Sequence, residues 1–327
     1  MEWWGQTWLN EGFATFVSYI GSEHVDPTPS LHPWDRFYVR EMQRVMKQDE
    51  NTNVHWPMTD ETTDRGDQDR MFGMFSYQKG GSVIRMMQSI ISQPTFTKGL
   101  TSYLTDLMYS AATEDDLFGH LYTAAMEDGK WPATNKPFSD VMKSWTNQAG
   151  LPVVHASRMA DGSLHLNQSW LVGIGDQSGE RLWHIPITFT SVEETPVLGW
   201  EKTEPYTWLW QDQVETEIPV GDVIPDNTPF VVNVQGTGYY RVNYDEDNWN
   251  SLAEVLKTNR DWIHPLNRAQ IICDVSALTE TGHVSSAVRD NILAYMESET
   301  EFGPTYAYQQ CVGGFKDDEL DQFRFKI

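Results

Sequence analysis

A single glutamate, Glu11, stands among aromatic residues near the start of the chain. Residues 3–16 read WWGQTWLNEGFATF, with three tryptophans and two phenylalanines around that carboxylate. The ordinary place for a glutamate is a solvated helix face, because glutamate is rarely fully buried unless it is paired. A carboxylate crowded by aromatic groups needs a partner, and a metal ion is one. These residue types make Glu11 a candidate metal ligand.

A second candidate, Tyr77, precedes a pair of glycines. In a helix, Gly80 and Gly81 share the face of Tyr77, because residues three and four positions apart are neighbours. Two glycines in a helix interior cost about 1 kcal/mol each relative to alanine. That cost suggests that something approaches this face closely. A tyrosine packed over a helix crossing at the glycines is one interpretation, and the pattern alone does not exclude others.

Helical periodicity predicts the element that carries Glu11. From about Trp8 onward, apolar residues recur at the spacing of one helix face. The predicted apolar stripe consists of Leu9, Phe13, Phe16, Val17 and Ile20. Glu11 falls on the other side of this helix, close to small residues.

The same periodicity predicts further helices along the chain. They lie at residues 33–47, in three stretches between 96 and 145, and at 249–256, 267–278 and 286–296. Gly282 is a predicted helix stop and Ser285 a predicted N-cap. Residues 59–69 are rich in acid and predict an exposed loop.

Helical periodicity gives way to period 2 at about residues 150–152. Trp183–Phe189 alternates as a half-buried strand does. Phe230–Val234 and Tyr240–Tyr244 also alternate, and the glycine-rich residues 235–238 between them predict a hairpin. Together these segments predict a small β-sandwich over residues 151–245.

Composition limits the function classes. The chain has 327 residues, enough for two or three domains, and its 39% hydrophobic content is ordinary for a globular protein. A net charge of −24 argues against nucleic acid or anionic membrane surfaces as partners. The two cysteines, Cys273 and Cys311, allow one bridge or two free thiols. Asn167 begins an Asn-Gln-Ser triplet, a weak glycosylation signal.

Four segments, in order, resemble the zinc aminopeptidases of the aminopeptidase N family. They match the patterns W-W-x-x-x-W-L-N-E-G-F-A-x-F, S-Y-x-K-G-x-x-V-x-R-M, W-T-x-Q-x-G-x-P-V-V and G-Y-Y-R-V-N-Y. The resemblance implies a multidomain α + β fold. Residues 1–150 would be the mostly helical C-terminal part of a thermolysin-like catalytic domain, 151–245 a β-sandwich, and 246–327 the start of an α-helical superhelix.

The resemblance also implies roles for the two candidates. Glu11 matches the third zinc ligand of the family, and Tyr77 matches the tyrosine that donates a hydrogen bond to the tetrahedral oxyanion. The two histidines and the general base of the family's H-E-x-x-H segment would precede Met1, and none of the nine histidines forms an H-x-x-x-H pair. We expect one Zn²⁺ per complete catalytic domain, and we expect the 327 residues alone to be inactive.

Substrates, location and partners follow from the resemblance as expectations. The substrates would be peptides with a free N-terminus, and the location the extracellular face of the plasma membrane. No run of 18 apolar residues, signal peptide or lipid-anchor tail is present. Because animal members are commonly tethered to membranes, we expect a fragment whose parent carries the tether.

Two other classes remain as alternatives. One is a non-catalytic extracellular binding module, such as a toxin-docking surface, because insect gut members of the family serve as docking sites for bacterial toxins. The other is a glycoside hydrolase, since Asn10-Glu11 resembles the acid/base dipeptide of some glycosidases. That mechanism needs a second carboxylate about 5–9.5 Å away, and no candidate stands out.

Overall fold

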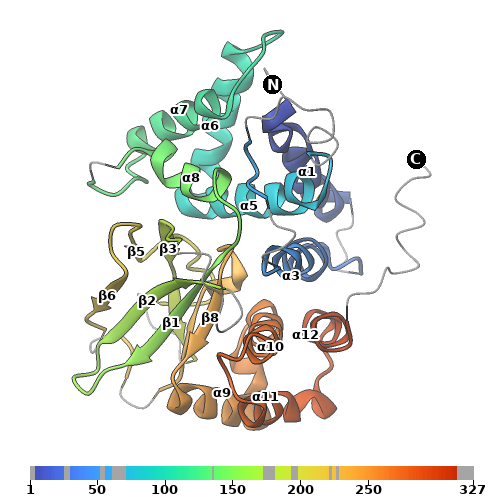
Figure 1. Cartoon of the computed structure of the whole chain (residues 1–327), viewed down its shortest axis with the longest axis vertical. Coiled ribbons are helices and arrows are strands. Elements are labelled where there is room, and N and C mark those ends of the chain that lie inside the picture. Colours follow the sequence, from blue (N-terminus) through green and yellow to red (C-terminus); the bar gives the residue numbers. More distant parts are fainter. Residues whose placement is uncertain are drawn as a thin grey trace.

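The computed structural model describes residues 4–25, 30–51, 56–60, 71–134, 136–171, 181–192, 198–220, 223–225 and 228–314. Within them the chain forms helices, then short strands, then helices again (Figure 1). One contiguous set of buried apolar side chains runs through all three segments. The fold is therefore mixed helix and sheet. No helix in these ranges is long and apolar enough to cross a bilayer.

The first segment is helical, as the periodicity predicts. Its elements are η1 (Trp4–Gln6), α1 (Trp8–Val25), α2 (Pro33–Arg36), η2 (Phe37–Gln43), α3 (Arg44–Asp49), η3 (Phe75–Lys79), α5 (Gly80–Ile91), α6 (Gln93–Asp106), α7 (Glu114–Glu127) and α8 (Phe138–Thr146). The helix predicted over 33–47 is confirmed as the continuous run from α2 to α3. Of the predicted acidic loop, residues 61–70 lie outside the described part.

The predicted stripe of α1 is right for Leu9 and Phe16 but wrong for Val17, which is 52% exposed. The face that is buried consists of Trp8, Leu9, Gly12, Phe16 and Tyr19. A glycine adds nothing to an apolar pattern, yet Gly12 lies at the contact with α5. The neighbouring helix therefore sets which face is buried, and the hydropathy pattern could not reveal that.

In the described residues of the middle segment there are eight short strands, which form one mixed sheet and two antiparallel ones. They are β1 (Pro152–Arg158), β2 (Leu164–Trp170), β3 (Ile185–Ile187), β4 (Phe189–Ser191), β5 (Thr207–Leu209), β6 (Glu215–Ile218), β7 (Phe230–Val232) and β8 (Arg241–Tyr244). The largest sheet has the order β6-β2-β1-β8, with β8 parallel to β1. Two smaller sheets pair β3 with β5 and β4 with β7.

The predicted hairpin between β7 and β8 is wrong. β7 pairs with β4 and β8 pairs with β1, so the two strands belong to different sheets. The glycine-rich segment between them leaves the strand path at Asn233, which has a φ of 68° and is followed by a short 3-10 turn. The Asn233 side chain holds this turn through two bonds to Gly238. Its amide N–H donates to the Gly238 carbonyl, and its amide oxygen accepts the Gly238 N–H. The turn redirects the chain instead of folding it back.

The predicted half-buried strand at Trp183–Phe189 is also different from expectation. It divides into β3 and β4 at Thr188, whose hydroxyl accepts a bond from the Val234 N–H at 2.8 Å. Every residue from Trp183 to Thr190 is buried. Both faces of this strand pair are covered, so alternation in the sequence does not mean one wet face here.

The last segment is helical, as predicted. It contains α9 (Glu246–Asn259), η5 (Arg260–Trp262), α10 (Pro265–Glu280), α11 (Ser286–Leu293), η6 (Ala294–Ser298), α12 (Phe302–Ala307) and η7 (Tyr308–Val312). Ser285 caps α11 by accepting the Val288 N–H, as predicted. A disulfide joins Cys273 of α10 to Cys311 of η7, which resolves the question that the sequence left open.

Candidate functional site

Two helices from distant parts of the sequence meet almost backbone to backbone. A Cβ atom on Gly12 of α1 would lie 2.9 Å from the carbonyl carbon of Gly80 in α5. A Cβ on Gly81 would lie 3.2 Å from a methyl of Thr15. Glycine is thus needed on both sides of this crossing, because any side chain would push the helices apart. The close neighbour that the paired glycines suggest is α1.

This crossing brings Glu11 and Tyr77 together. Glu11 directly precedes Gly12 on α1, and Tyr77 lies in the π-helical turn η3 that leads into α5. Both side chains are half-buried. The pKa of Tyr77 is raised above its usual value, first by partial burial and then by the charge of Glu11 and a hydrogen bond with it. At neutral pH this phenol therefore keeps its proton and can donate it in a hydrogen bond.

The aromatic residues around Glu11 mostly build the core. The Trp8 ring is fully buried, stacks on Phe118 at 6.2 Å, and donates its indole N–H to Thr59 at 2.9 Å. Phe16 packs edge-on against Phe96. Trp4 is 42% exposed, and Trp3 lies outside the described residues. The expectation that the rings crowd the carboxylate is therefore wrong for Trp8 and Phe16, which pack into the core.

The donor set around Glu11 bears on the implied zinc ion. Zinc in catalytic sites takes three protein ligands and keeps one position open. Among the described residues no three histidine, cysteine, aspartate or glutamate side chains gather closely enough to hold a metal. Within the same residues Glu11 forms no ion pair, and its carboxylate hydrogen-bonds the Tyr77 phenol. Glu11 fits the part of one ligand, and the described residues do not supply the others.

Asn167 lies on the sheet, away from the crossing. It sits in β2, opposite His155 of β1 and Glu215 of β6. Its side chain is half-buried, whereas the next residue, Gln168, is buried and bonds the backbone of Trp183. The triplet therefore presents its asparagine on the outer face of the largest sheet.

Sequence reasoning missed a group of buried charges behind the crossing. Lys79, two residues after Tyr77, forms a fully buried ion pair with Asp49 at 2.7 Å. Arg85 of α5 donates to the carbonyls of Gly236 and Gln235 at 2.7 and 3.0 Å. In each case a cation interrupts an otherwise apolar or glycine-rich segment, which is the one signal that could have marked it.

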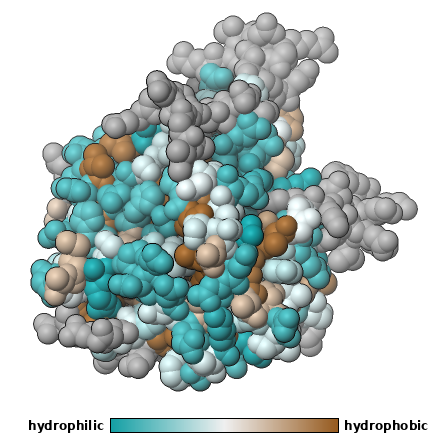
Figure 2. Space-filling model, turned by 60° about the horizontal axis from the view of Figure 1, so that its bottom comes forward, coloured by the Kyte–Doolittle hydropathy of each residue, from teal (hydrophilic) through white to brown (hydrophobic). Residues whose placement is uncertain are grey.

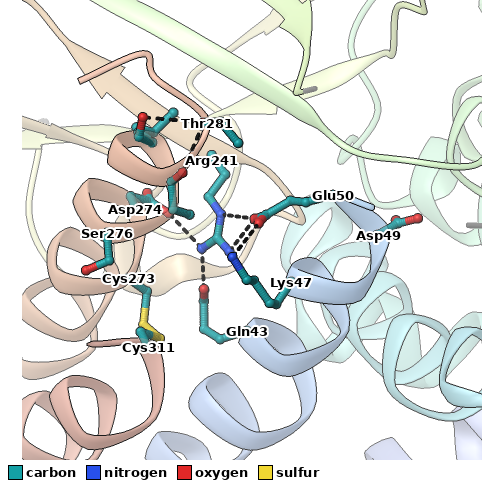
Figure 3. Close-up of polar contacts among 12 residues, drawn as sticks. Gln43, Lys47, Asp49, Glu50, Arg241, Cys273, Asp274, Ser276, Thr281 and Cys311 are labelled. Carbon is teal, nitrogen blue, oxygen red and sulfur yellow. Dashed lines mark hydrogen bonds and ion pairs between the residues drawn. A yellow bond between two sulfur atoms is a disulfide. The ribbon is translucent and has the colours of Figure 1, made fainter. Parts of the chain in front are cut away.

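The largest of these charge groups surrounds Arg241 (Figure 3). Its guanidinium binds Glu50 at 2.7 Å and Asp274 at 3.1 Å, and it also donates to Gln43. The Asp274 carboxylate accepts the Val242 N–H at 3.1 Å as well. One cation thereby connects the end of α3, strand β8 and helix α10.

Comparisons with known proteins match two parts of the chain to family models. Residues 1–145 match the Peptidase family M1 domain, and residues 229–321 match the ERAP1-like C-terminal domain. Over 92% of this chain, the sequence is 34% identical to aminopeptidase N of Plutella xylostella. Over 94% of this chain, it is 31% identical to aminopeptidase Ey of Gallus gallus. It is 29% identical to the human thyrotropin-releasing hormone-degrading ectoenzyme over 95%.

The chain belongs to peptidase family M1. The two family models together match well over half of it, and the relatives align with nearly all of it. It spans about a third of the length of these curated relatives, 31% of each of the first two and 29% of the ectoenzyme. The segment that holds Glu11 and Tyr77 falls within the match to the M1 domain.

Proposed function

We propose that this chain is part of a zinc-dependent metalloaminopeptidase that removes N-terminal residues from peptides. The observation that supports this most is the juxtaposition of Glu11 and a protonated Tyr77 at a glycine-lined helix crossing. The crossing lies in the segment that matches the M1 peptidase domain, and several relatives are named aminopeptidases.

Glu11 acts as one zinc ligand in this proposal. The ion, when bound, would supply a Lewis acid that lowers the pKa of water and polarises the scissile carbonyl. Helix α1 holds the carboxylate on a rigid element whose rotation is fixed by the contact at Gly12. The remaining ligands and the general base come from residues outside the described part, as the resemblance implies.

Tyr77 acts as the hydrogen-bond donor to the developing oxyanion of the substrate. Its raised pKa keeps the proton on the phenol oxygen at neutral pH. Placed donors of this kind are worth about 2.7–4 kcal/mol of transition-state stabilisation.

The proposed parts of the molecule follow the sequence boundaries. Residues 1–150 are the C-terminal part of the catalytic domain of thermolysin-like type, and 151–245 are a β-sandwich. Residues 246–327 begin the α-helical superhelix. The change from helices to strands after Thr146, and back to helices at Glu246, supports these boundaries.

We also propose that the parent protein works outside the cell. The Cys273–Cys311 disulfide supports an oxidising compartment, where such bonds form and persist. One relative is named an ectoenzyme. Asn167, on the outer face of the sheet, is then a proposed glycosylation site. A membrane tether, if the parent has one, lies outside the described residues.

On the face drawn in Figure 2, the described residues show no feature that favours the alternative of a toxin-docking module over the peptidase. Docking sites on soluble domains commonly expose a contiguous apolar patch. On the face drawn in Figure 2, the hydrophobic residues form small groups separated by hydrophilic ones. We therefore keep the peptidase as the proposed function.

The experiment that tests the proposal replaces Tyr77 in the full-length enzyme that contains this chain. Tyr77→Phe should lower kcat by about 10²–10³-fold and leave KM nearly unchanged, because one oxyanion donor is lost. Tyr103→Phe is the matched control, since Tyr103 is also half-buried with a raised pKa but lies on α6. An unchanged kcat in the Tyr77 variant rules out the assigned role.

Glu11 is tested by metal content instead of rate. Glu11→Gln in the same full-length enzyme should lose stoichiometric zinc by elemental analysis, because a neutral amide is a poor zinc ligand. Zinc retained at one per chain removes Glu11 from the ligand set. The 327 residues alone should hydrolyse no alanine anilide, because the described residues supply one proposed zinc ligand, Glu11.

A further inference from the structure

A closed buried cluster lies directly behind the turn that carries Tyr77. Lys79 donates to the Asp49 carboxylate at 2.7 Å and to the Gly150 carbonyl at 3.0 Å. The other Asp49 oxygen accepts the Gly150 N–H at 2.9 Å, and the Tyr239 hydroxyl donates to Asp49 at 3.2 Å. Lys79 and Asp49 have fully buried side chains. Each of the two charges is therefore paired with the other and hydrogen-bonded to further groups of the cluster.

The cluster joins segments that are far apart in the sequence. Lys79 ends η3, Asp49 ends α3, Gly150 precedes β1, and Tyr239 precedes β8. Gly150 has a φ of 88°, and a Cβ there would lie 2.5 Å from the Trp170 indole nitrogen, so only glycine fits. The lysine therefore bonds a backbone loop that cannot shift easily.

Stability alone does not account for such a pair. Removing two charges from water costs several kcal/mol per ion, and hydrophobic residues of similar volume are often as stable or more stable. What a buried pair supplies with certainty is a fixed direction, because the ammonium must reach these particular oxygens. A lysine that bonds two fixed oxygens holds its own turn in one position.

The geometry of the turn transmits that position to Tyr77. Residues two apart on a helix point about 200° apart, which is to nearly opposite sides. Lys79 points into the core, and Tyr77 points out toward Glu11. Segment η3 is a π-helical turn, whose wider winding needs support from its surroundings. The glycine contact with α1 fixes one side of this turn, and the Lys79 cluster fixes the other.

We infer that Lys79, held by Asp49 and Gly150, is a positioning residue that sets the orientation of Tyr77 relative to Glu11. The inference rests on the proposed function only for the catalytic role of that orientation, with Tyr77 as the hydrogen-bond donor and Glu11 as the zinc ligand. Lys79 itself touches neither substrate nor metal in this assignment, because its ammonium is enclosed.

The first test needs no catalysis. In the 327-residue chain, Tyr77 is replaced by 3-fluorotyrosine and observed by ¹⁹F NMR at constant pH. Glu11→Gln should move this signal in the wild-type background, because the carboxylate lies beside the phenol. In a Lys79→Met background the ¹⁹F signal itself should broaden or shift. The further shift that Glu11→Gln causes should be at least threefold smaller there than in the wild-type background.

Two variants keep this test decisive. Lys79→Met leaves Asp49 as an unpaired buried charge, so the double variant Lys79→Met with Asp49→Leu removes both charges and protects folding. Arg268→Met is the matched control, because it breaks another buried pair, with Glu299 at 3.0 Å, far from η3 in the chain. A Glu11 effect of wild-type size in the folded double variant overturns the inference, whatever the peptidase result.

The second test uses the full-length enzyme. The double variant should lower kcat by about 10–100-fold with KM within twofold, as expected when a catalytic group is misplaced by about 1 Å. Adding Tyr77→Phe to the double variant should lower kcat by less than Tyr77→Phe lowers it in the wild type, because both changes act through the same hydrogen-bond donor. Multiplying losses would mean that Lys79 acts independently of Tyr77 and would overturn the assignment.

Discussion

Two adjacent acids at the end of α3 enter two different buried clusters. Asp49 turns toward Lys79 and the crossing, while Glu50 turns toward Arg241, and Figure 3 shows the two side chains pointing apart. Both clusters are almost fully enclosed. Yet the first pairs one buried cation with one carboxylate, whereas the second shares one buried cation between Glu50 and Asp274, with the exposed Lys47 lying 3.9 Å from Glu50.

This difference in charge balance teaches what each cluster can do. The Lys79 cluster is neutral and satisfied by backbone and tyrosine groups, so it suits a positional role. In the Arg241 cluster two buried carboxylates share one buried guanidinium, and burial raises the pKa of Asp274 to about 6 despite its partner Arg241. We expect the second cluster to matter more for stability and for its dependence on pH.

The largest expected effect comes from removing the shared cation. Arg241→Met leaves two buried carboxylates, Glu50 and Asp274, without their guanidinium. We expect a loss of about 5 kcal/mol in the free energy of unfolding, the upper end for a broken buried pair. Lys79→Met should lose about 3 kcal/mol, because Asp49 keeps two other donors. Urea unfolding of the oxidised chain at pH 7 measures both.

An exposed arginine gives the baseline for this comparison. Arg289 has a side chain 36% exposed and pairs with its neighbour Asp290. Arg289→Met should change stability by no more than about 0.5 kcal/mol, as surface substitutions usually do. Equal losses for Lys79→Met and Arg241→Met would show that the charge balance of the two clusters does not matter.

The disulfide sharpens the comparison, because it adjoins only one of the clusters. Cys273 directly precedes Asp274 on α10, and its bond to Cys311 closes a separation of 38 residues. Replacing both cysteines by alanine should cost about 2–4 kcal/mol. The loss should be non-additive with Arg241→Met and additive with Lys79→Met, since coupling requires contact. If the losses add in both combined variants, the disulfide is not energetically coupled to the Arg241 cluster.

Local periodicity was enough to predict most helices. α6 to α11 lie where apolar residues recur at helical spacing, and Ser285 caps its helix as its side-chain chemistry requires. The motif order also pointed to Glu11 and Tyr77, which the crossing of α1 and α5 brings together. These features depend on residues within a few positions of one another or on a long ordered resemblance.

Long-range pairings could not be predicted in this way. Strand β8 pairs in parallel with β1 across most of the middle segment, so the glycine-rich turn before it suggested the wrong partner. Val17 looked buried because a pattern of apolar residues cannot show that Gly12 faces the neighbouring helix. Lys79 carried no visible partner, since Asp49 lies thirty positions earlier and only the fold joins them.

The last expected effect is a change of stability with pH that belongs to the Arg241 cluster. Asp274 has a folded-state pKa of about 6, above its usual value of 3.8, chiefly because burial disfavours its charge. The folded chain then holds a proton that the unfolded chain has lost between about pH 4 and 6, so the Asp274 contribution to stability falls as pH rises through that window. Relative to Asp274→Asn, the wild type should lose about 2 kcal/mol between pH 4.5 and 7, because the folded-state pKa lies about 1.5 units above pH 4.5 and each unit corresponds to about 1.4 kcal/mol. Urea unfolding at the two pH values measures the difference, and a pH-independent gap for Asp274→Asn would mean that Arg241 keeps Asp274 ionised over this range.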